Sequence, residues 1–154
     1  MSDRSATLES VLAANRYLVL ATADEDGRPW ATPVFFGRLD AEQLCWVSSP
    51  ESRHSRNIAA RSAIAITVFD SAVAVGQAEA AYFEADAAAA VGDEVAAVLD
   101  ALNAKLPAAK QLSADDLGPD GRLVAYRAQL RRRFVLVRGG DEELGNVTDR
   151  TVEL

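Results

Sequence analysis

The sequence predicts a small antiparallel β-barrel, mainly β, with three helices inserted between its strands. Three observations favour this fold class: two early hairpins, short connections between strands, and one strand, 63–69, that is nearly all apolar. The regular alternation of helix and strand that marks a doubly wound sheet is absent. The length of 154 residues, with 49% hydrophobic and 25% charged side chains, indicates one globular domain, 1–154.

The first third of the chain predicts one helix and three strands. The helix begins at a capping Thr7 and ends at Asn15 and Arg16, since Leu8, Val11 and Leu12 recur on one helical face. The strands are expected at 17–23, 30–38 and 43–48. An acidic turn closed by glycine, 24–27, makes the first hairpin.

The rest of the chain predicts two more helices and the remaining strands. Ser52 caps a short helix, 53–60, and 63–69 is a central strand buried on both faces. Further strands are expected at 73–83, 122–129 and 133–138, with a turn near 130–132 that holds the solvated arginine run 131–133. A helical period spans 91–106 and stops at Pro107, the alanine run 85–90 is typical of a helix, and the tail from Gly139 is expected to be irregular.

Composition excludes several classes of site. The net charge of −7 argues against nucleic acid as a partner, since a phosphate backbone needs a basic surface. One cysteine, Cys45, and one histidine, His54, exclude a disulfide framework and a multi-histidine or multi-cysteine metal site. Cys45 is expected in or near the core. With no secretory signal or membrane segment visible, we expect a cytoplasmic protein.

The segment 44–58 holds the strongest candidate site. A strand ends in Ser48 and Ser49, and a helix then opens with Ser52, Arg53 and His54. Free N–H groups at a helix start favour an anion, arginine can grip phosphate with two hydrogen bonds, and serine hydroxyls can donate. The sequence therefore indicates a phosphate site here.

A plainer interpretation of the same segment stays open. Arg56 lies one turn after Arg53, and Asn57 follows at i+4, so one helical face is basic and polar. A capped surface helix with solvated arginines explains this spacing slightly better than a site does. A lone histidine such as His54 is also more often a surface or packing residue than a ligand.

An ordered set of segments resembles one known family. The segments are LVLATA (18–23), PWATPVFF (29–36), LCWVSS (44–49), SRHSRNI (52–58) and AITVFD (65–70). Together they resemble the pyridoxamine 5′-phosphate oxidase-related FMN-binding split-barrel family, from about residue 8 to 83. Residues 124–127 and 134–137 resemble the family's last strands more weakly.

The resemblance implies a six-stranded antiparallel split β-barrel with a few flanking helices. It implies a homodimer with one FMN in each of two clefts at the interface. By position, Arg53 and His54 match the basic pair at the flavin phosphate, and Ser48 and Ser49 match the strand-end residues beside it. The residues matching the strand along the isoalloxazine ring are Trp30, Thr32, Pro33, Val34 and Phe35. Gln77 falls on a strand that in the family often approaches the flavin from one subunit.

The chemistry of the individual residues refines what the resemblance implies for them. Pro33 cannot donate to a sheet ladder, so it favours an edge that faces a ligand. Trp30 and Phe35 have opposite parity along the strand, so at least one of them is expected in ordinary barrel core. Gln77 is equally well explained as a buried, partnered residue or as an exposed one without a role. Many relatives have lysine where His54 stands, so FMN affinity is expected to weaken at alkaline pH.

We expect a flavoprotein that moves hydride or electrons between reduced nicotinamide and a small substrate through FMN. No side chain is an obvious acid, base or nucleophile, so no catalytic residue and no metal is assigned. The tail from Gly139 has no tryptophan and does not resemble the oxidase's substrate-binding ending with its tryptophan and arginine, so the oxidase itself is not expected. The alternatives are a deazaflavin-dependent reductase of the same fold, or a non-catalytic flavin or haem binder for storage or stress.

Overall fold

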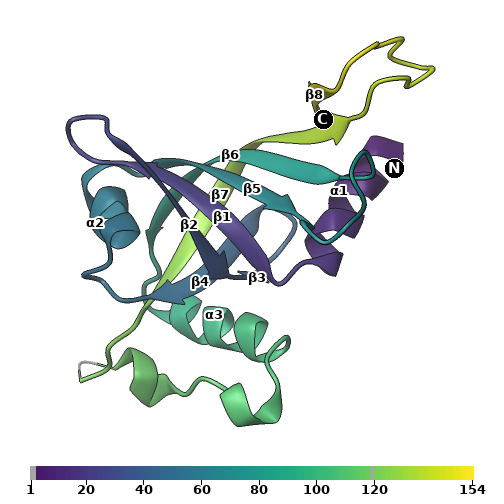
Figure 1. Ribbon diagram of the computed structural model, residues 1–154. Coiled ribbons are helices and arrows are strands. Elements are labelled where there is room, and N and C mark those ends of the chain that lie inside the picture. Colours follow the sequence, from purple (N-terminus) through teal and green to yellow (C-terminus); the bar gives the residue numbers. More distant parts are fainter. Residues whose placement is uncertain (1–2, 119) are drawn as a thin grey trace.

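The computed structural model describes residues 3–118 and 120–154. Its strands form one antiparallel sheet in the order β2-β1-β5-β6-β7-β4-β3, and β8 pairs with β7. Figure 1 shows this sheet curled into a barrel that stays open between β2 and β4. The strands are β1 (Tyr17–Ala23), β2 (Pro29–Phe35), β3 (Gly37–Arg38), β4 (Gln43–Ser48), β5 (Ala63–Phe69), β6 (Ala80–Ala89), β7 (Val124–Val137) and β8 (Arg150–Glu153). The mainly β split barrel is thus confirmed, with eight strands among the described residues.

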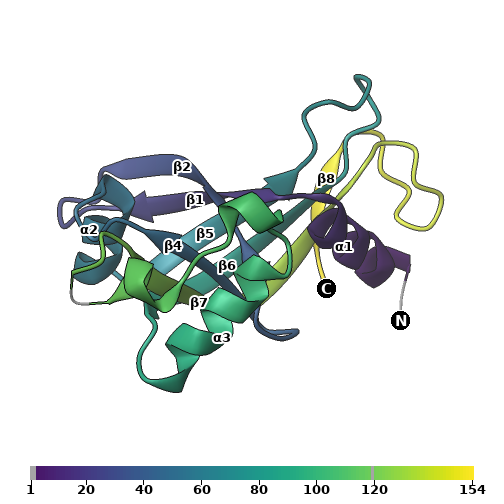
Figure 2. The same ribbon diagram turned by 90° about the horizontal axis from the view of Figure 1, so that it is seen from below.

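Helices cover the ends and one side of the barrel (Figure 2). They are α1 (Asp3–Ala14), α2 (Arg53–Ala60), α3 (Asp93–Asn103) and the short 3-10 helices η1 (Ala108–Lys110) and η2 (Ala114–Leu117). The apolar face of α1, with Leu8, Val11 and Leu12, is buried in the core as predicted. Thr7 does not cap this helix, because the helix begins a turn earlier and Thr7 Oγ1 donates to the carbonyl of Asp3 (3.2 Å).

The predicted strand 30–38 is two strands, because the chain changes partners in the middle. β2 pairs with β1, whereas β3 pairs with β4 on the other side of the opening. Between them, the Phe36 side chain is fully buried. Gly37 lies against α3 so closely that an added Cβ would be 3.1 Å from the carbonyl carbon of Ala101. This crossing brings the two edges of the open barrel together.

β5 is central but is not buried on both faces. Ile64, Ile66 and Val68 point into the core, while Ala63, Ala65 and Phe69 are exposed. The alanines made the strand look uniformly apolar in the sequence. Their small side chains instead line the outer face of the sheet, as the alternation of a strand requires.

The strand predicted at 73–83 is wrong at its start. Residues 70–79 form an exposed loop, and β6 runs from Ala80 to Ala89. The alanine run 85–90, typical of a helix, therefore lies almost wholly in a strand. Pairing with β5 on one side and β7 on the other overrides the helix propensity of alanine.

The two C-terminal strands predicted at 122–129 and 133–138 are one long strand, β7. The register against β6 shifts between Glu84 and Ala85, so that Arg131 is an extra residue in a β-bulge. The arginine run therefore lies within a bent strand and not in a turn. Arg131 pairs with Asp86 (2.7 Å), and Arg132 pairs with Glu84 (3.1 Å) and with the C-terminal Glu153 (2.8 Å).

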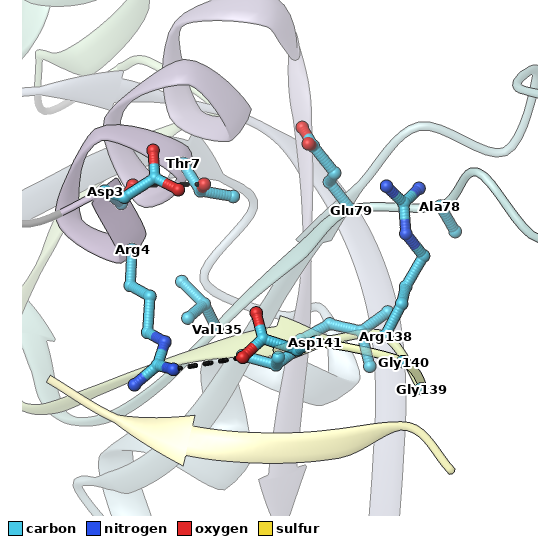
Figure 3. A pocket seen from close by; sticks show the side chains of 12 residues that line it. Asp3, Arg4, Thr7, Ala78, Glu79, Val135, Arg138, Gly139, Gly140 and Asp141 are labelled. Atoms are coloured by element: carbon cyan, nitrogen blue, oxygen red, sulfur yellow. Dashed lines mark hydrogen bonds and ion pairs between the residues drawn. The ribbon is translucent and has the colours of Figure 1, made fainter. Parts of the chain in front are cut away.

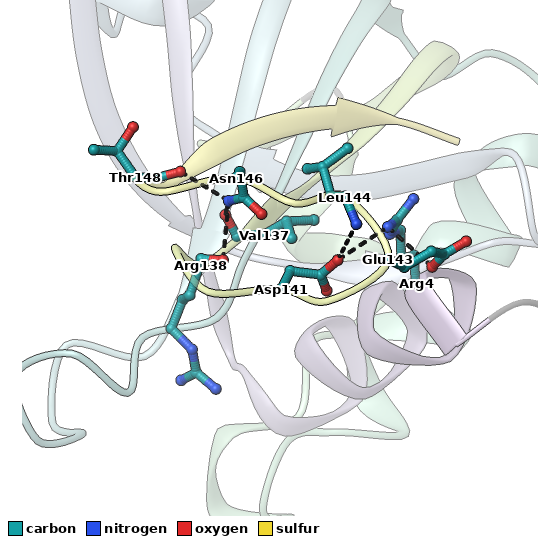
Figure 4. Close-up of polar contacts among 8 residues, drawn as sticks. All are labelled: Arg4, Val137, Arg138, Asp141, Glu143, Leu144, Asn146 and Thr148. Carbon is teal, nitrogen blue, oxygen red and sulfur yellow. Dashed lines mark hydrogen bonds and ion pairs between the residues drawn. The ribbon is translucent and has the colours of Figure 1, made fainter.

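The tail is more ordered than predicted, since β8 pairs with β7. Figure 4 shows the loop before β8 folded around Asn146. The buried Asn146 Nδ2 donates to the carbonyls of Thr148 (2.8 Å), Arg138 (3.0 Å) and Val137 (3.4 Å). Asp141 accepts from the Leu144 amide (2.7 Å). The Asn146 side chain thus holds together a loop that the sequence predicts to be irregular.

α3 begins at Asp93 and ends at Asn103, so it is shorter at both ends than the predicted helix 91–106. Its buried residues Val98 and Leu102 pack on Cys45. Cys45 is fully buried, as expected, and burial raises the pKa of its thiol to about 11. No helix in the described part of the chain is long and apolar enough to cross a membrane.

Candidate functional site

The start of α2 is built as the sequence predicts. Ser52 is the N-cap: its backbone is extended and its Oγ accepts from the Ser55 amide (3.3 Å). The helix then runs over the predicted residues, 53–60. The amides of its first turn and its dipole therefore present partial positive charge beside the end of β4.

Four side chains gather at this helix start, and we call them the serine–histidine cluster: Ser48, Ser49, Ser52 and His54. His54 Nε2 lies 2.8 Å from Ser48 Oγ and 3.2 Å from Ser52 Oγ. The Ser52 hydroxyl also lies 2.9 Å from the Ser49 carbonyl, and Ser49 Oγ accepts from the Glu51 amide (3.2 Å). The structure thus brings together the strand-end serines and the histidine that the sequence singled out.

His54 is half-buried in this cluster. Burial lowers the pKa of its imidazole from the usual 6.5, because a partly dehydrated ring resists protonation. The ring is therefore neutral at neutral pH and can share one nitrogen with the hydroxyls. A neighbouring anion would reverse this preference, since it stabilises the imidazolium.

Arg53 stands beside the cluster with its guanidinium free of acidic partners. Its guanidinium carbon lies 4.4 Å from the ring centroid of Trp30, which is a cation–π contact. Among the described residues, no carboxylate lies within ion-pair distance of Arg53. Arg53 is thus held in place and left able to bind an anion.

The polar face predicted for α2 is divided in the structure. Asn57 points inward, where Nδ2 donates to Thr22 Oγ1 (3.0 Å) in a buried contact. Arg56 stays outside and donates to the Glu51 carbonyl (2.7 Å). Arg53, Arg56 and Asn57 still share one open hollow of about 570 Å³, which the hairpin tip 24–26 closes on the far side.

β2 is an edge strand, as Pro33 predicts. It pairs only with β1 among the described residues, and it lies beside β4 across the open seam of the barrel (Figure 1). The register puts Trp30, Thr32 and Val34 on the inner face, and Pro33 and Phe35 on the outer face. The free backbone edge of β2 therefore faces the seam.

The β2 side chains have different surroundings. Val34 is buried in the core, whereas Trp30, at the seam, is 40% exposed. Phe35 packs edge-on against Tyr17, with ring centroids 6.0 Å apart. Neither ring is buried in the barrel core, where at least one was expected: Phe35 is partly buried on the outer face, against the cluster beneath α3. Trp30 contacts the arginine of the candidate site.

Gln77 does not join the other candidates within one chain. It lies in the loop 70–79 and not on a strand, and its Oε1 accepts from Arg138 Nη1 (3.5 Å). α2 precedes β5 and this loop follows β5, so the two sit at opposite ends of the barrel in both views (Figures 1 and 2). The seven residues of β5 separate them by roughly 20 Å.

A second hollow lies at that far end (Figure 3). Arg4 of α1 and Arg138 line it together with Glu79 and Asp141. Arg4 is already paired with Asp141 (3.5 Å) and Glu143 (3.0 Å). None of the candidate site residues predicted from the sequence lines this hollow, and its charges are mixed, so it does not compete with the α2 site.

The sequence did not indicate that Thr22 and the hairpin tip 24–26 belong to the site. Thr22 is buried at an inward position of β1 and bonds to Asn57. A hydroxyl at an inward position of the apolar run 17–23 was the available signal. The tip residues Asp24, Glu25 and Asp26 were assigned only to a turn, and nothing local indicates that they face the arginines of α2.

Comparison with known proteins gives one family and a set of similar folds. The family model of pyridoxamine 5′-phosphate oxidase matches residues 5–136. No curated protein matches the chain significantly by sequence.

Solved structures resemble the chain at low identity. HutZ, the haem storage protein from Vibrio cholerae, has a TM-score of 0.72 at 20% identity, over 87% of this chain and 95% of that one. A haem-binding protein from Mycobacterium smegmatis has a TM-score of 0.71 at 19% identity, over 99% of this chain and 60% of that one. This chain thus spans less than two thirds of the latter's length. An FAD-binding protein from Mesorhizobium loti has a TM-score of 0.64 at 16% identity, over 88% of this chain and 94% of that one.

Proposed function

This chain belongs to the pyridoxamine 5′-phosphate oxidase family, and from that premise we propose that it is an FMN-binding oxidoreductase. It holds the FMN phosphate at the start of α2 and the ring along β2. It passes hydride or electrons between a reduced nicotinamide and a small substrate, in the cytoplasm. The observation that carries the proposal is the free guanidinium of Arg53 beside the serine–histidine cluster.

The donors at the start of α2 suit a phosphate monoester. Arg53 donates two charged hydrogen bonds to the phosphate, and the backbone amides of the first turn add neutral donors. Ser48 and Ser49 add hydroxyls, and His54 gains a proton as the dianion approaches. Asn57 connects α2 to β1 through its hydrogen bond to Thr22.

The edge of β2 suits the flavin ring. Backbone N–H and C=O groups that no neighbouring strand uses can pair with the pyrimidine ring, which carries both donors and acceptors. Thr32, Pro33, Val34 and Phe35 contribute mainly this backbone. Bound FMN supplies the hydride or electron transfer, and the protein supplies its placement and its shielding from water.

We propose further that two chains form the complete site. The outer face of β1, β2 and β5 carries exposed small and apolar side chains: Tyr17, Ala21, Ala31, Ala63, Ala65 and Phe69. Such a face favours a self-complementary interface. Gln77 lies at the end of the barrel opposite α2, and we propose that it contacts the flavin held by the other protomer.

Haem and a deazaflavin are the competing cofactors. Two relatives in fold are haem proteins, but His54 Nε2 already lies within hydrogen-bond distance of two hydroxyls. An iron ligand would have to give these bonds up. Spectra of the purified protein separate flavin from haem, and competition between FMN and a deazaflavin separates those two.

The central experiment measures FMN and riboflavin affinity in the wild type and in Arg53→Ala. Loss of a charged hydrogen bond predicts that FMN affinity falls by about 1.5–3 kcal/mol, while riboflavin, which lacks the phosphate, is unaffected. A colourless wild type that binds no added FMN would overturn the proposal. So would an equal loss for both ligands in the variant.

A matched pair of variants tests the dimer. Ala65→Glu puts a charge on the outer face and is expected to give monomers by sedimentation, with weaker FMN binding although Arg53 is untouched. Ala96→Glu, on the exposed side of α3, controls for the added charge. A wild type that sediments as a monomer, with or without FMN, contradicts the proposed interface.

A further inference from the structure

The hollow beside Arg53 has two oppositely charged walls. Arg53 and Arg56 of α2 form one wall, and the turn between β1 and β2 forms the other. We call this turn the acidic tip: Asp24, Glu25 and Asp26. Figure 1 shows the turn next to α2, and Figure 2 shows the same neighbourhood from below.

The walls face each other without touching. Among the described residues, none of the acidic-tip carboxylates makes an ion pair with Arg53 or Arg56. The carboxylates of Glu25 and Asp26 are exposed. Their negative charges therefore face the hollow without a direct ion-pair partner among the described residues.

The acidic tip is a turn closed by hydrogen bonds. Asp24 Oδ1 accepts from the amides of Asp26 (3.0 Å) and Arg28 (2.9 Å), and Gly27 takes the left-handed conformation (φ 81°) that the turn needs. Arg61, just after α2, donates to the Glu25 carbonyl (3.4 Å). These bonds define the shape of the turn and connect it to the end of α2.

The order of residues along β2 decides what the acidic tip would meet. β2 begins next to the tip, passes Trp30 with Arg53 stacked over it, and continues to Phe35. A flavin with its phosphate at Arg53 and its ring along 32–35 extends away from the tip. Any chain attached beyond the phosphate would run toward the tip.

We infer that the acidic tip makes the site selective for a flavin whose anionic chain ends at a single phosphate. Longer anionic chains, such as the second phosphate of FAD or the glutamate chain of a deazaflavin cofactor, would bring negative charge against Glu25 and Asp26. The inference rests on the proposed FMN site at α2. It adds a specificity element on the other side of the hollow.

The test compares three ligands in the wild type and in a double variant. Glu25→Gln with Asp26→Asn removes two charges and keeps Asp24, which holds the turn. Affinities for FMN, FAD and a deazaflavin with a glutamate chain are measured at low and high salt. The control, Asp100→Asn with Glu142→Gln, removes two exposed charges elsewhere.

We expect the wild type to prefer FMN. In the tip variant, the affinity for FAD and the deazaflavin should rise relative to FMN by roughly three- to tenfold at low salt, and the gain should shrink as salt screens the charges. The control should leave the ratio unchanged. An unchanged ratio in the tip variant, with FMN still bound, overturns this inference alone. A wild type that binds no FMN overturns the inference together with the proposed function.

Discussion

The guanidinium of Arg53 lies over the indole ring of Trp30, with 4.4 Å between its central carbon and the ring centroid. The two residues come from α2 and from the edge strand β2, so the contact joins the two elements of the candidate site. Trp30 thereby orients the group that would bind phosphate without itself needing to touch it.

Replacing Trp30 should weaken phosphate binding through Arg53. Trp30→Leu removes the cation–π contact and is expected to lower FMN affinity by roughly three- to thirtyfold, the equivalent of about 0.5–2 kcal/mol. Trp30→Phe should retain part of it. Fluorescence titration with FMN and with riboflavin checks this. If both ligands lose affinity equally, Trp30 acts on the ring and not through Arg53.

FMN affinity should depend on the protonation of His54. Burial keeps the pKa of the free imidazole below 6.5, and a phosphate dianion beside it raises that pKa. Binding therefore takes up a proton, so affinity increases as the pH falls through the window between the two values and decreases as the pH rises. The slope is at most about tenfold per pH unit.

Titrations between about pH 5 and 8 with the wild type and His54→Gln check this dependence. The phosphate's own protonation affects both proteins alike, so the difference between the curves isolates His54. Parallel curves would remove His54 from the phosphate site. The lowered pKa of the free imidazole extends the expected window toward acidic pH.

The buried hydrogen bond from Asn57 to Thr22 should hold α2 on the barrel. Asn57→Ala leaves the Thr22 hydroxyl without its donor and is expected to lower the free energy of unfolding by about 1–3 kcal/mol. Urea unfolding of Asn57→Ala, Thr22→Val and the double variant measures the coupling. Strictly additive effects would show that the bond contributes nothing specific.

Asn146 should keep the loop before β8 closed. Asn146→Ala removes the donor shared by the carbonyls of Val137, Arg138 and Thr148. We expect amide exchange in residues 138–153 to speed up by roughly five- to a hundredfold, as befits about 1–3 kcal/mol of local stability. The neighbouring Val147→Ala, at a side chain 93% exposed, is the control. Equal protection in both variants would contradict the role of Asn146.

Elements with local signals could be predicted from the sequence. Ser52 and the helix 53–60, and the strands 17–23 and 43–48, agree with the structure because caps, turns and alternation are encoded within a few residues. The serine–histidine cluster was predictable for the same reason, since Ser48 and His54 are only six positions apart. Pro33 likewise identifies an edge strand on its own.

Features that depend on distant partners could not be predicted. The alanines of β6 become a strand only because β5 and β7 flank them, and the bulge at Arg131 is a matter of register between two strands. Thr22 and Asn57 are 35 positions apart, so their bond has no local signature. The acidic tip faces α2 only once the hairpin and the helix are packed together.

The complete burial of Cys45 has a practical consequence for probing the molecule. Since the chain has no other cysteine and this thiol is protonated and sealed beneath α3, thiol-directed dyes and spin labels should leave the wild type unmarked. A cysteine introduced at the hairpin or in the loop 70–79 would carry a single reporter without removal of the native one. Movement of either segment on cofactor binding can then be followed by fluorescence or paramagnetic resonance.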